Sequence, residues 1–414
     1  MIHFAIMGHG VVGSGVAEVF FKNQKKLEEK LGQELNLKYV LDLRDFPALP
    51  YSDRFIKDFQ TILTDPEVSI VAELMGGLHP SYEFVKSCLE AGKSVVTSNK
   101  ELVAEKGAEL LAVAEKKHVS FLFEASVGGG IPIIRPLHQC LAANEINAIA
   151  GILNGTTNFI LTKMIHERMS FEDALALAQK LGYAERDPSA DVDGHDSCRK
   201  ISILASLAFG QHVYPQNVHT EGIRQVSLTD VQYSASWGGV IKLIGQAVKR
   251  EDGSLLVMVS PAFLEHSSQL AGVDDVFNGI LVRGDATGDV VFYGKGAGKL
   301  PTASAVMADI IDAAKNTDAE RTLHWVDTGV NCVCDYLDTS CCFFLRLRSH
   351  NLSSLRQQLS QLLGQVRELT IDNQDSDEIG VVTGLVKESR VLQIIGQLEE
   401  DGLELCSCIR VLDF

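Results

Sequence analysis

A glycine-rich turn near the N-terminus is the feature that most constrains the fold of this chain. Residues 2–7 form a short apolar run, and the next six residues, GHGVVG, place Gly8, Gly10 and Gly13 in the order G-x-G-x-x-G. In a strand-to-helix unit the first glycine allows a tight turn, the second lets a pyrophosphate approach the backbone, and the third lets the helix pack on the strand. The anion would then meet N–H groups at the helix start. The sequence therefore predicts a dinucleotide-binding unit at the N-terminus.

Apolar runs and helical patterns alternate after this turn, which is typical of an open, parallel, doubly wound sheet. Ligands of such sheets bind outside the carboxyl ends of the strands. Lys100 stands there at a helix start, where the helix dipole disfavours a cation, so a bound anion or ligand explains it better than a surface position. Asp42, Arg44 and Asp45 lie together near the end of the second strand and leave the choice between NAD and NADP open. We expect strands at residues 2–7, 37–45, 69–74, 94–97 and 119–125.

Size and charge limit what this chain can do. With 414 residues it is too long for one ordinary core, so two or three domains are expected. Its net charge of −17 disfavours nucleic acid and anionic membranes as partners. No apolar run is long enough to span a membrane, and no basic segment precedes the first strand. The nine cysteines lack the spacing of a zinc site, which predicts reduced thiols in a cytoplasm.

Residues 182–200 form an acidic loop, broken by Gly, Pro and Ser, that leads directly into an apolar helix. If residues 196–209 are helical, Asp196 and Lys200 lie at the head of one stripe that continues as core. A lysine at the rim of an apolar surface, facing a carboxylate, can have its proton affinity tuned for acid–base chemistry. The alternative is an ordinary ion pair on a solvated surface. A calcium loop is rejected because the glycine and the terminal carboxylate do not fall where such a loop needs them.

The middle of the chain predicts a mixed sheet for substrate binding and subunit contact. Asn154 follows an apolar strand and is expected to cap a helix. The glycine-rich bend at 126–136 can turn its carbonyls toward a ligand or cation, or serve as a hinge. Glycines around Gly296 precede another helix, as a phosphate-proximal turn or a simple cap. We expect a helix at 237–249 and strands at 255–264, 278–286 and 289–294.

The C-terminal ninety or so residues have a different pattern. Strands and helices follow one another in the order β-α-β-β-α-β, which predicts a ferredoxin-like fold. The expected elements are strands at 341–348, 366–371, 378–387 and 403–413 and helices at 353–363 and 389–402.

Seven sequence blocks between residues 4 and 315 together resemble homoserine dehydrogenases. They are GHGVVG, ELMGG, VVTSNK, FEASVGGGIPII, GILNGTTNFIL, GYAERDPSADVDGHDSCRKISILASLAFG and GKGAGKLPTASAV. The resemblance implies NAD(P)-dependent interconversion of L-homoserine and L-aspartate 4-semialdehyde, in the pathway to threonine, isoleucine and methionine. It implies a homodimer or homotetramer with a Rossmann domain at 1–134 and a return helix at 299–317, a catalytic and dimerisation domain at 135–300, and an ACT-like domain at 325–414.

The resemblance also assigns roles to individual residues. Lys200 looks like the general acid, Asp196 and Lys100 would assist catalysis, and Glu185 and Asp191, with Lys100, would bind the substrate. The cofactor would be held by Gly8, Gly10, Val11, Val12, Gly13, Ser98, Lys100 and Gly296. A monovalent cation, Na⁺ or K⁺, would bind main-chain carbonyls of Glu124, Val127, Gly129 and Ile131.

Two alternatives stay open at this point. One is another oxidoreductase of the same fold, acting on a different amino acid or aldehyde, since fold alone does not decide function. The other is a non-catalytic amino-acid sensor, which would be expected to lose Lys100, Glu185, Asp196 or Lys200, whereas this chain keeps all four. An amino-acid effector at the C-terminal domain, such as threonine, is a further possibility. Against it, residues 348–355 read RSHNLSSL where such domains usually carry an Asp-x-Pro-Gly turn.

Overall fold

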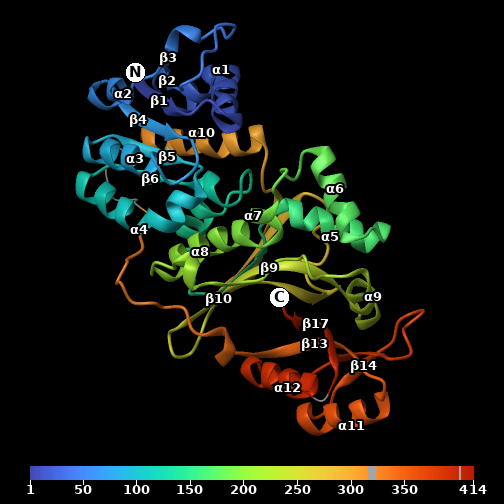
Figure 1. Ribbon diagram of the computed structural model, residues 1–414. Helices are drawn as coiled ribbons and strands as arrows, with labels where there is room; N and C mark the ends of the chain where they lie inside the picture. Colours follow the sequence, from blue (N-terminus) through green and yellow to red (C-terminus); the bar gives the residue numbers. More distant parts are fainter. Residues whose placement is uncertain (316–322, 401) are drawn as a thin grey trace. The chain divides into compact units, whose positions relative to one another are not determined.

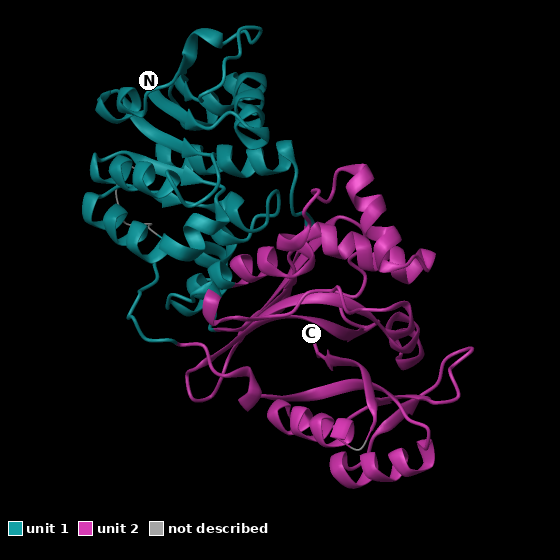
Figure 2. Ribbon diagram, in the orientation of Figure 1, with its two compact units in different colours: residues 1–145, 202–215, 294–331 teal, residues 146–201, 216–293, 332–414 magenta. Residues whose placement is uncertain are grey.

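The computed structural model describes residues 1–315, 323–400 and 402–414 (Figure 1). The chain forms two compact units (Figure 2). Unit 1 contains residues 1–145, 202–215 and 294–331, and unit 2 contains residues 146–201, 216–293 and 332–414.

Unit 1 is built on a six-stranded sheet in the order β3-β2-β1-β4-β5-β6, in which neighbouring strands are parallel. The order reverses between β1 and β4, which is the switch point of a dinucleotide-binding sheet. The predicted doubly wound parallel sheet is therefore confirmed. The strands are β1 (Ile2–Met7), β2 (Leu35–Leu41), β3 (Phe55–Ile56), β4 (Val68–Glu73), β5 (Ser94–Thr97) and β6 (Phe121–Leu122).

The helices of unit 1 cover this sheet with apolar faces. Phe4 of β1 and Phe20 of α1 meet edge to face and share one core with Ala303, Met307 and Ile310 of α10. α10 begins at Lys299 as expected for the return helix, and residues 316–317 of that prediction lie outside the described residues. The helices are α1 (Val11–Leu31), α2 (Phe59–Thr64), α3 (Ser81–Glu90), α4 (Lys100–Lys117) and α10 (Lys299–Lys315), with short turns at Ser52–Arg54, Glu124–Ser126 and Pro136–Cys140.

Unit 2 is organised around one mixed sheet in the order β12-β11-β7-β9-β10-β17-β13-β15-β14, with β8 paired to β10 and β16 to β13. Its first strands are β7 (Ile146–Ile152), β8 (His219–Thr220), β9 (Gly239–Lys249), β10 (Leu255–Glu265), β11 (Phe277–Gly284) and β12 (Gly288–Lys295). The helices of this unit are α5 (Gly155–Glu167), α6 (Phe171–Leu181), α7 (Ser189–Val192) and α9 (Leu228–Trp237), with short turns at Pro215–Asn217 and Tyr336–Asp338. Of α8 (His195–Phe209), only the first turns, up to residue 201, belong to unit 2.

The helix predicted at 237–249 is wrong. α9 ends at Trp237, Gly238 adopts the left-handed conformation, and the following residues form the strand β9. β9 lies between β7 and β10, and residues 239–247 are buried. A strand covered on both faces loses the alternation of polar and apolar residues, so its sequence pattern is the same as that of a buried helix.

The C-terminal elements of unit 2 have the predicted ferredoxin-like arrangement. Their strand order is β17-β13-β15-β14 with antiparallel neighbours. An apolar core joins this face of the sheet to α11 and α12, which lie together below the strands in Figure 1. β17 also pairs in parallel with β10, so the same sheet continues into this module. The elements are β13 (Ser340–Arg348), α11 (Leu352–Leu363), β14 (Arg367–Leu369), β15 (Glu378–Val382), β16 (Val386–Lys387), α12 (Glu388–Glu400) and β17 (Glu404–Val411).

All nine cysteines are free thiols, as their unpatterned spacing predicted. In the described parts of the chain, no helix is both long enough and apolar enough to cross a bilayer.

Candidate active site

The glycine turn after β1 has the geometry that its sequence predicted. Gly8 has φ +95°, and a Cβ there would lie 2.9 Å from the backbone of Leu74 and Met75. A Cβ on Gly13 would lie 1.9 Å from the carbonyl oxygen of Gly8, whereas the space around Gly10, which caps α1, is open. The first turn of α1, at Val11 and Val12, carries no acidic side chain. The turn can therefore present backbone N–H groups to a pyrophosphate.

A cavity of about 560 Å³ lies beside this turn in unit 1, a size that suits a small ligand or cofactor. Asp42, at its wall, accepts hydrogen bonds from the backbone N–H of His9 at 2.8 Å and from Arg44 Nη2 at 2.9 Å. The hydrogen bond from Arg44 lowers the pKa of the Asp42 carboxyl well below its ordinary value. Asp42, Arg44 and Lys57 thus line one cavity. The carboxylate of Asp42 suits a ribose hydroxyl, and the guanidinium of Arg44 suits a 2′-phosphate.

A buried carboxylate, Glu73, organises the carboxyl ends of the next strands. It accepts hydrogen bonds from the backbone N–H of Met75 at 2.9 Å and from the Thr97 hydroxyl at 2.7 Å. Asn99 caps α4 by accepting from the N–H of Leu102 and donates to the carbonyl of Gly77 at 2.7 Å. Ser98 and Lys100 flank Asn99, so this network fixes the backbone that carries both predicted residues.

The glycine bend of unit 1 is too tight for side chains. Gly129 has φ +57°, and a Cβ there would lie 2.3 Å from the carbonyl oxygen of Gly296. The Glu124 carboxylate accepts hydrogen bonds from the backbone N–H groups of Ile133 and Ile134 at 2.6 and 2.9 Å. The segment that contains the predicted carbonyl ligands, from Glu124 to Ile131, is therefore held by its own carboxylate and packs against the turn at Gly296.

Unit 2 contains the second group of predicted residues. Lys200 is buried, with 7% of its surface exposed, and Asp196 has 3% exposed. Lys200 Nζ lies 2.7 Å from Asp196 Oδ2 and 2.7 Å from the carbonyl oxygen of Leu153, the residue that directly follows β7. Both side chains come from one face of α8, as the predicted helical stripe required. The pair is therefore a buried ion pair at the edge of the core and not the solvated surface pair of the alternative interpretation.

Asn154 is a member of this cluster that the sequence assigned only as a helix cap. It does cap α5, since its side-chain oxygen accepts from the N–H of Thr157 at 2.9 Å. Its Nδ2 also donates to Asp191 Oδ1 at 2.7 Å and to Asp196 Oδ2 at 2.8 Å. The capping preference was visible in the sequence, but the partners lie 37 and 42 residues away, and nothing local indicates them.

The environment raises the pKa of the Asp191 carboxyl above its ordinary value. Burial is the main cause and the nearby charge of Asp196 adds to it, while Asn154, Lys200 and Thr156 oppose the shift. The half-buried Asp191 and the buried Asp196 and Lys200 thus bring two carboxylates and one ammonium together, an arrangement that suits proton transfer.

The remaining predicted residues lie outside this cluster. Glu185 is exposed in the loop after α6, where its carbonyl accepts a hydrogen bond from Gln179 Nε2 at 3.0 Å. The Thr156 hydroxyl donates to the carbonyl of Tyr183 at 2.7 Å, so the loop is tied to α5 two residues before Glu185. Lys100 belongs to unit 1.

Comparison with known proteins shows which family this chain is related to. Residues 132–311 match the family model described as homoserine dehydrogenase, and residues 8–124 match that of its NAD-binding domain. The chain belongs to the homoserine dehydrogenase family. A homoserine dehydrogenase of Neisseria gonorrhoeae is 37% identical over 416 residues, covering 96% of this chain and 95% of that protein.

Solved structures agree with this assignment. A homoserine dehydrogenase from Thiobacillus denitrificans has a TM-score of 0.91 at 34% identity and covers 100% of this chain and 98% of that one. A hyperthermophilic archaeal homoserine dehydrogenase mutant in complex with NADPH has a TM-score of 0.65 at 30% identity, covering 75% of this chain and 97% of that one. This chain is accordingly an NAD(P)-dependent oxidoreductase.

Proposed function

We propose that this chain interconverts L-homoserine and L-aspartate 4-semialdehyde, with Lys200 as the proton donor to the aldehyde oxygen. The observation that carries the proposal is the buried ammonium of Lys200, 2.7 Å from both Asp196 and the Leu153 carbonyl. Negative charge develops on the aldehyde oxygen during reduction, and a nearby ammonium stabilises it and can give it a proton. In the reverse direction Lys200 would accept the proton from the hydroxyl of homoserine.

The substrate's own charges suggest how the other residues bind it. Glu185 would take the substrate ammonium, which its exposed position in the loop permits. Asp191 would orient the substrate, and Asp196 would orient Lys200. Lys100 would lie beside both substrate and nicotinamide, and it remains the second candidate for the proton transfer.

The cofactor residues of the proposal are Gly8, Gly10, Val11, Val12, Gly13, Ser98, Lys100 and Gly296. The close approaches at Gly8 and Gly13 and the open space at Gly10 fit a pyrophosphate on this turn. When bound, the reduced nicotinamide supplies a hydride to the aldehyde carbon. Arg44 and Lys57 would favour a 2′-phosphate and Asp42 a ribose hydroxyl, so both NAD and NADP are candidates.

A monovalent cation, Na⁺ or K⁺, is proposed at the carbonyls of Glu124, Val127, Gly129 and Ile131. An all-oxygen set of ligands suits a hard cation. The tight bend fits such a site, because a Cβ on Gly128 would lie 2.4 Å from the carbonyl oxygen of Ile131. Among the described residues, no group of three or more His, Cys, Asp or Glu side chains could hold a metal ion instead.

We further propose three domains, at 1–134 with the return helix, 135–300 and 325–414, in a homodimer or homotetramer. The ferredoxin-like order of the last domain supports its assignment as ACT-like. The nine free thiols and the proposed role in making threonine, methionine and isoleucine support a cytoplasmic location.

An amino-acid effector at the C-terminal domain is also proposed. A cavity of about 490 Å³ lies within unit 2, lined by Glu221, Glu388 and Arg410 among others. Both terminal nitrogens of Arg410 donate to Glu221 at 2.8 Å, and the N–H of Ile223 donates to the carbonyl of Val192 at 2.8 Å. A ligand that moved Glu221 would also move Ile223, two residues later, and through it Val192, the neighbour of Asp191.

The function is tested by following absorbance at the reduced-nicotinamide band with homoserine against NAD and NADP. We expect turnover with at least one cofactor, and threonine titrated into the assay tests the effector. No turnover with either cofactor, despite nucleotide binding, would leave the non-catalytic sensor as the better interpretation. A rate unchanged by threonine into the millimolar range would remove threonine as the effector.

A further inference from the structure

We propose that Asn154 is a positioning residue of the active site, which holds Asp191 and Asp196 together and thereby orients Lys200. The inference rests on the proposed roles of these three residues. One N–H of the Asn154 amide donates to Asp191 Oδ1 at 2.7 Å and the other to Asp196 Oδ2 at 2.8 Å. Asp196 Oδ2 is the same oxygen that accepts from Lys200 Nζ. A single neutral side chain thus bridges two carboxylates that come from different helices, α7 and α8.

The orientation of the Asn154 amide is determined by its surroundings. Its Oδ1 accepts from the backbone N–H of Thr157 at 2.9 Å and lies 3.2 Å from the Thr157 hydroxyl. Reversing the amide would place its oxygen against two carboxylates and its N–H groups against a backbone donor. Asn154 is 5% exposed, so water could not relieve such contacts. The amide nitrogen therefore has to face Asp191 and Asp196.

The bridge controls charge as well as geometry. Asp191 is faced by Asp196 and Lys200 from α8 and by Asn154 and Thr156 from the N-cap and first turn of α5. Burial and the charge of Asp196 raise the pKa of Asp191, and the amide of Asn154 opposes that rise. Without the amide, Asp191 would take up a proton at a higher pH, and below that pH it would not hold the substrate as a carboxylate.

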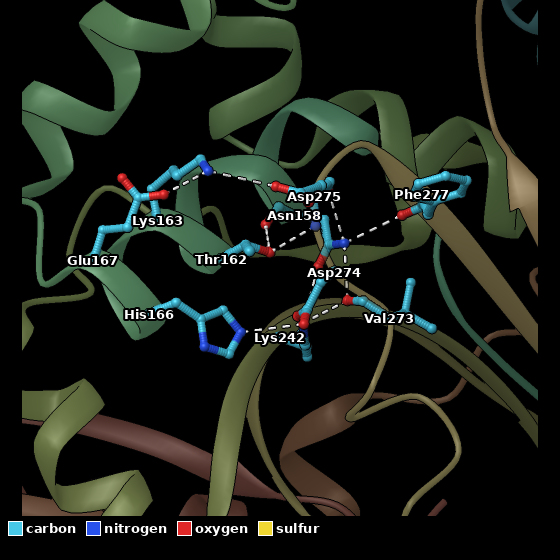
Figure 3. Close-up of polar contacts among 10 residues, drawn as sticks. All are labelled: Asn158, Thr162, Lys163, His166, Glu167, Lys242, Val273, Asp274, Asp275 and Phe277. Carbon is cyan, nitrogen blue, oxygen red and sulfur yellow. Dashed lines mark hydrogen bonds and ion pairs between the residues drawn. The ribbon is translucent and has the colours of Figure 1, made fainter.

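The loop at 273–277 fixes the backbone around Asn154. A Cβ on Gly155 would lie 2.7 Å from the carbonyl oxygen of Val276, so the loop at 273–277 packs directly on the helix start. Asn158, one turn further along α5, donates to the carbonyls of Val273 and Asp275 at 3.0 Å, and Lys242 Nζ donates to Val273 at 2.6 Å (Figure 3). Leu153, the residue before Asn154, supplies the carbonyl that binds Lys200. The loop at 273–277 therefore supports the contacts that both Leu153 and Asn154 make with the acidic cluster.

The test separates the bridging role of Asn154 from its capping role. In Asn154→Ser the hydroxyl can still cap α5, because serine is as good a cap as asparagine, but the two-armed donor is lost. The matched control is Asn351→Ser, since Asn351 caps α11 by accepting from the N–H of Ser354 at 3.1 Å. We expect kcat of Asn154→Ser to fall about tenfold at neutral pH, with the acid limb of the kcat/KM profile moved up by about one pH unit, as for a lost hydrogen bond to a charged group. The control should change neither.

An unchanged acid limb in Asn154→Ser would overturn the proposal, because a merely structural role lowers kcat without moving the titration. If that variant does not fold, Asn154→Asp carries the test. It keeps the cap, removes both donors and adds a third carboxylate, so its acid limb should move at least as far. An Asn154→Asp acid limb at the wild-type position would contradict the bridge equally.

The pH dependence of stability keeps this test independent of the proposed function. If wild type did not oxidise homoserine, the proposed function would fail, yet the bridge could still be measured by urea unfolding. Relative to its control, Asn154→Ser should lose more stability as the pH rises above the ordinary carboxyl pKa of 3.8, because Asp191 then has to ionise without the amide. A loss that does not depend on pH would mean that Asn154 only caps its helix.

Discussion

The buried lysines Lys200 and Lys242 are bound in nearly the same way at two places in unit 2. Lys200 Nζ lies 2.7 Å from the Leu153 carbonyl and from Asp196, and Lys242 Nζ lies 2.6 Å from the Val273 carbonyl and 3.1 Å from Asp274 (Figure 3). An asparagine accompanies each site: Asn154, the N-cap of α5, at the first and Asn158, within α5, at the second.

The difference between the two sites lies in their carboxylates. Asp196 is buried and has a second carboxylate, Asp191, beside it, whereas the side chain of Asp274 is 41% exposed and pairs with His166 at 3.1 Å. Burial alone would raise the pKa of Asp274, but Lys242 and His166 lower it below its ordinary value. A second carboxylate beside the buried pair of Asp196 and Lys200 makes proton transfer possible, whereas the half-exposed Asp274, shared by Lys242 and His166, only fixes a loop. Burial of a lysine is therefore not by itself a sign of catalysis.

The largest expected effect is the loss of turnover in Lys200→Ala. We expect kcat to fall by about 10²- to 10⁴-fold, the usual contribution of a positioned proton donor. NADPH binding, followed by its fluorescence, should persist because the glycine turn belongs to unit 1. Lys163→Ala is the control, since Lys163 pairs with Glu167 on the surface of α5. A near-normal kcat would transfer the proton-donating role to Lys100 or to water.

Glu185→Gln should act on binding more than on chemistry. Losing a charged partner of the substrate ammonium is expected to raise KM for homoserine roughly 10- to 100-fold. Steady-state kinetics at saturating cofactor measure this, and Glu172→Gln, on the first turn of α6, is the control. If kcat fell and KM did not change, Glu185 would belong with the Lys200 cluster instead of with the exposed loop.

Lys242→Met should lower stability while leaving chemistry nearly intact. The variant leaves Asn158 Oδ1 without its lysine donor and removes one of the two donors to the Val273 carbonyl, which costs about 1–3 kcal/mol in the free energy of unfolding. The shift of the urea midpoint measures this cost, and kcat per folded molecule should stay within a few-fold of wild type. A large loss of kcat at unchanged stability would contradict the structural assignment of this lysine.

The smallest effect, and the sharpest contrast, is the pH dependence of stability in Asp274→Asn and Asp191→Asn. A lowered pKa means that Asp274 adds stability as the pH rises toward 3.8, so its variant should lose stability relative to wild type over that rise. A raised pKa means that ionising Asp191 costs stability above pH 3.8, so its variant should gain relative to wild type there. Urea midpoints between pH 3 and pH 7 test both signs, and equal slopes would remove the electrostatic difference between the two sites.

Local sequence patterns predicted much of this molecule. The glycine turn, the alternation of strands and helices in unit 1 and the β-α-β-β-α-β order of the C-terminal module depend on neighbours within one element, and all were confirmed. The pairing of Asp196 with Lys200 was predicted for the same reason, since four residues make one helical turn. β9 was missed because a strand buried on both faces has no periodicity that separates it from a buried helix.

The sequence by itself determined which elements form, which residues head the stripe of α8 and which residue caps α5. Only the tertiary structure decided that the Asn154 amide bridges two carboxylates, that the Leu153 carbonyl after β7 binds Lys200 and that Lys242 fixes a loop. Each of these contacts joins residues 31 to 47 positions apart. Hydrogen bonds act over about 3 Å, and which distant groups come within that range depends on how the elements pack together.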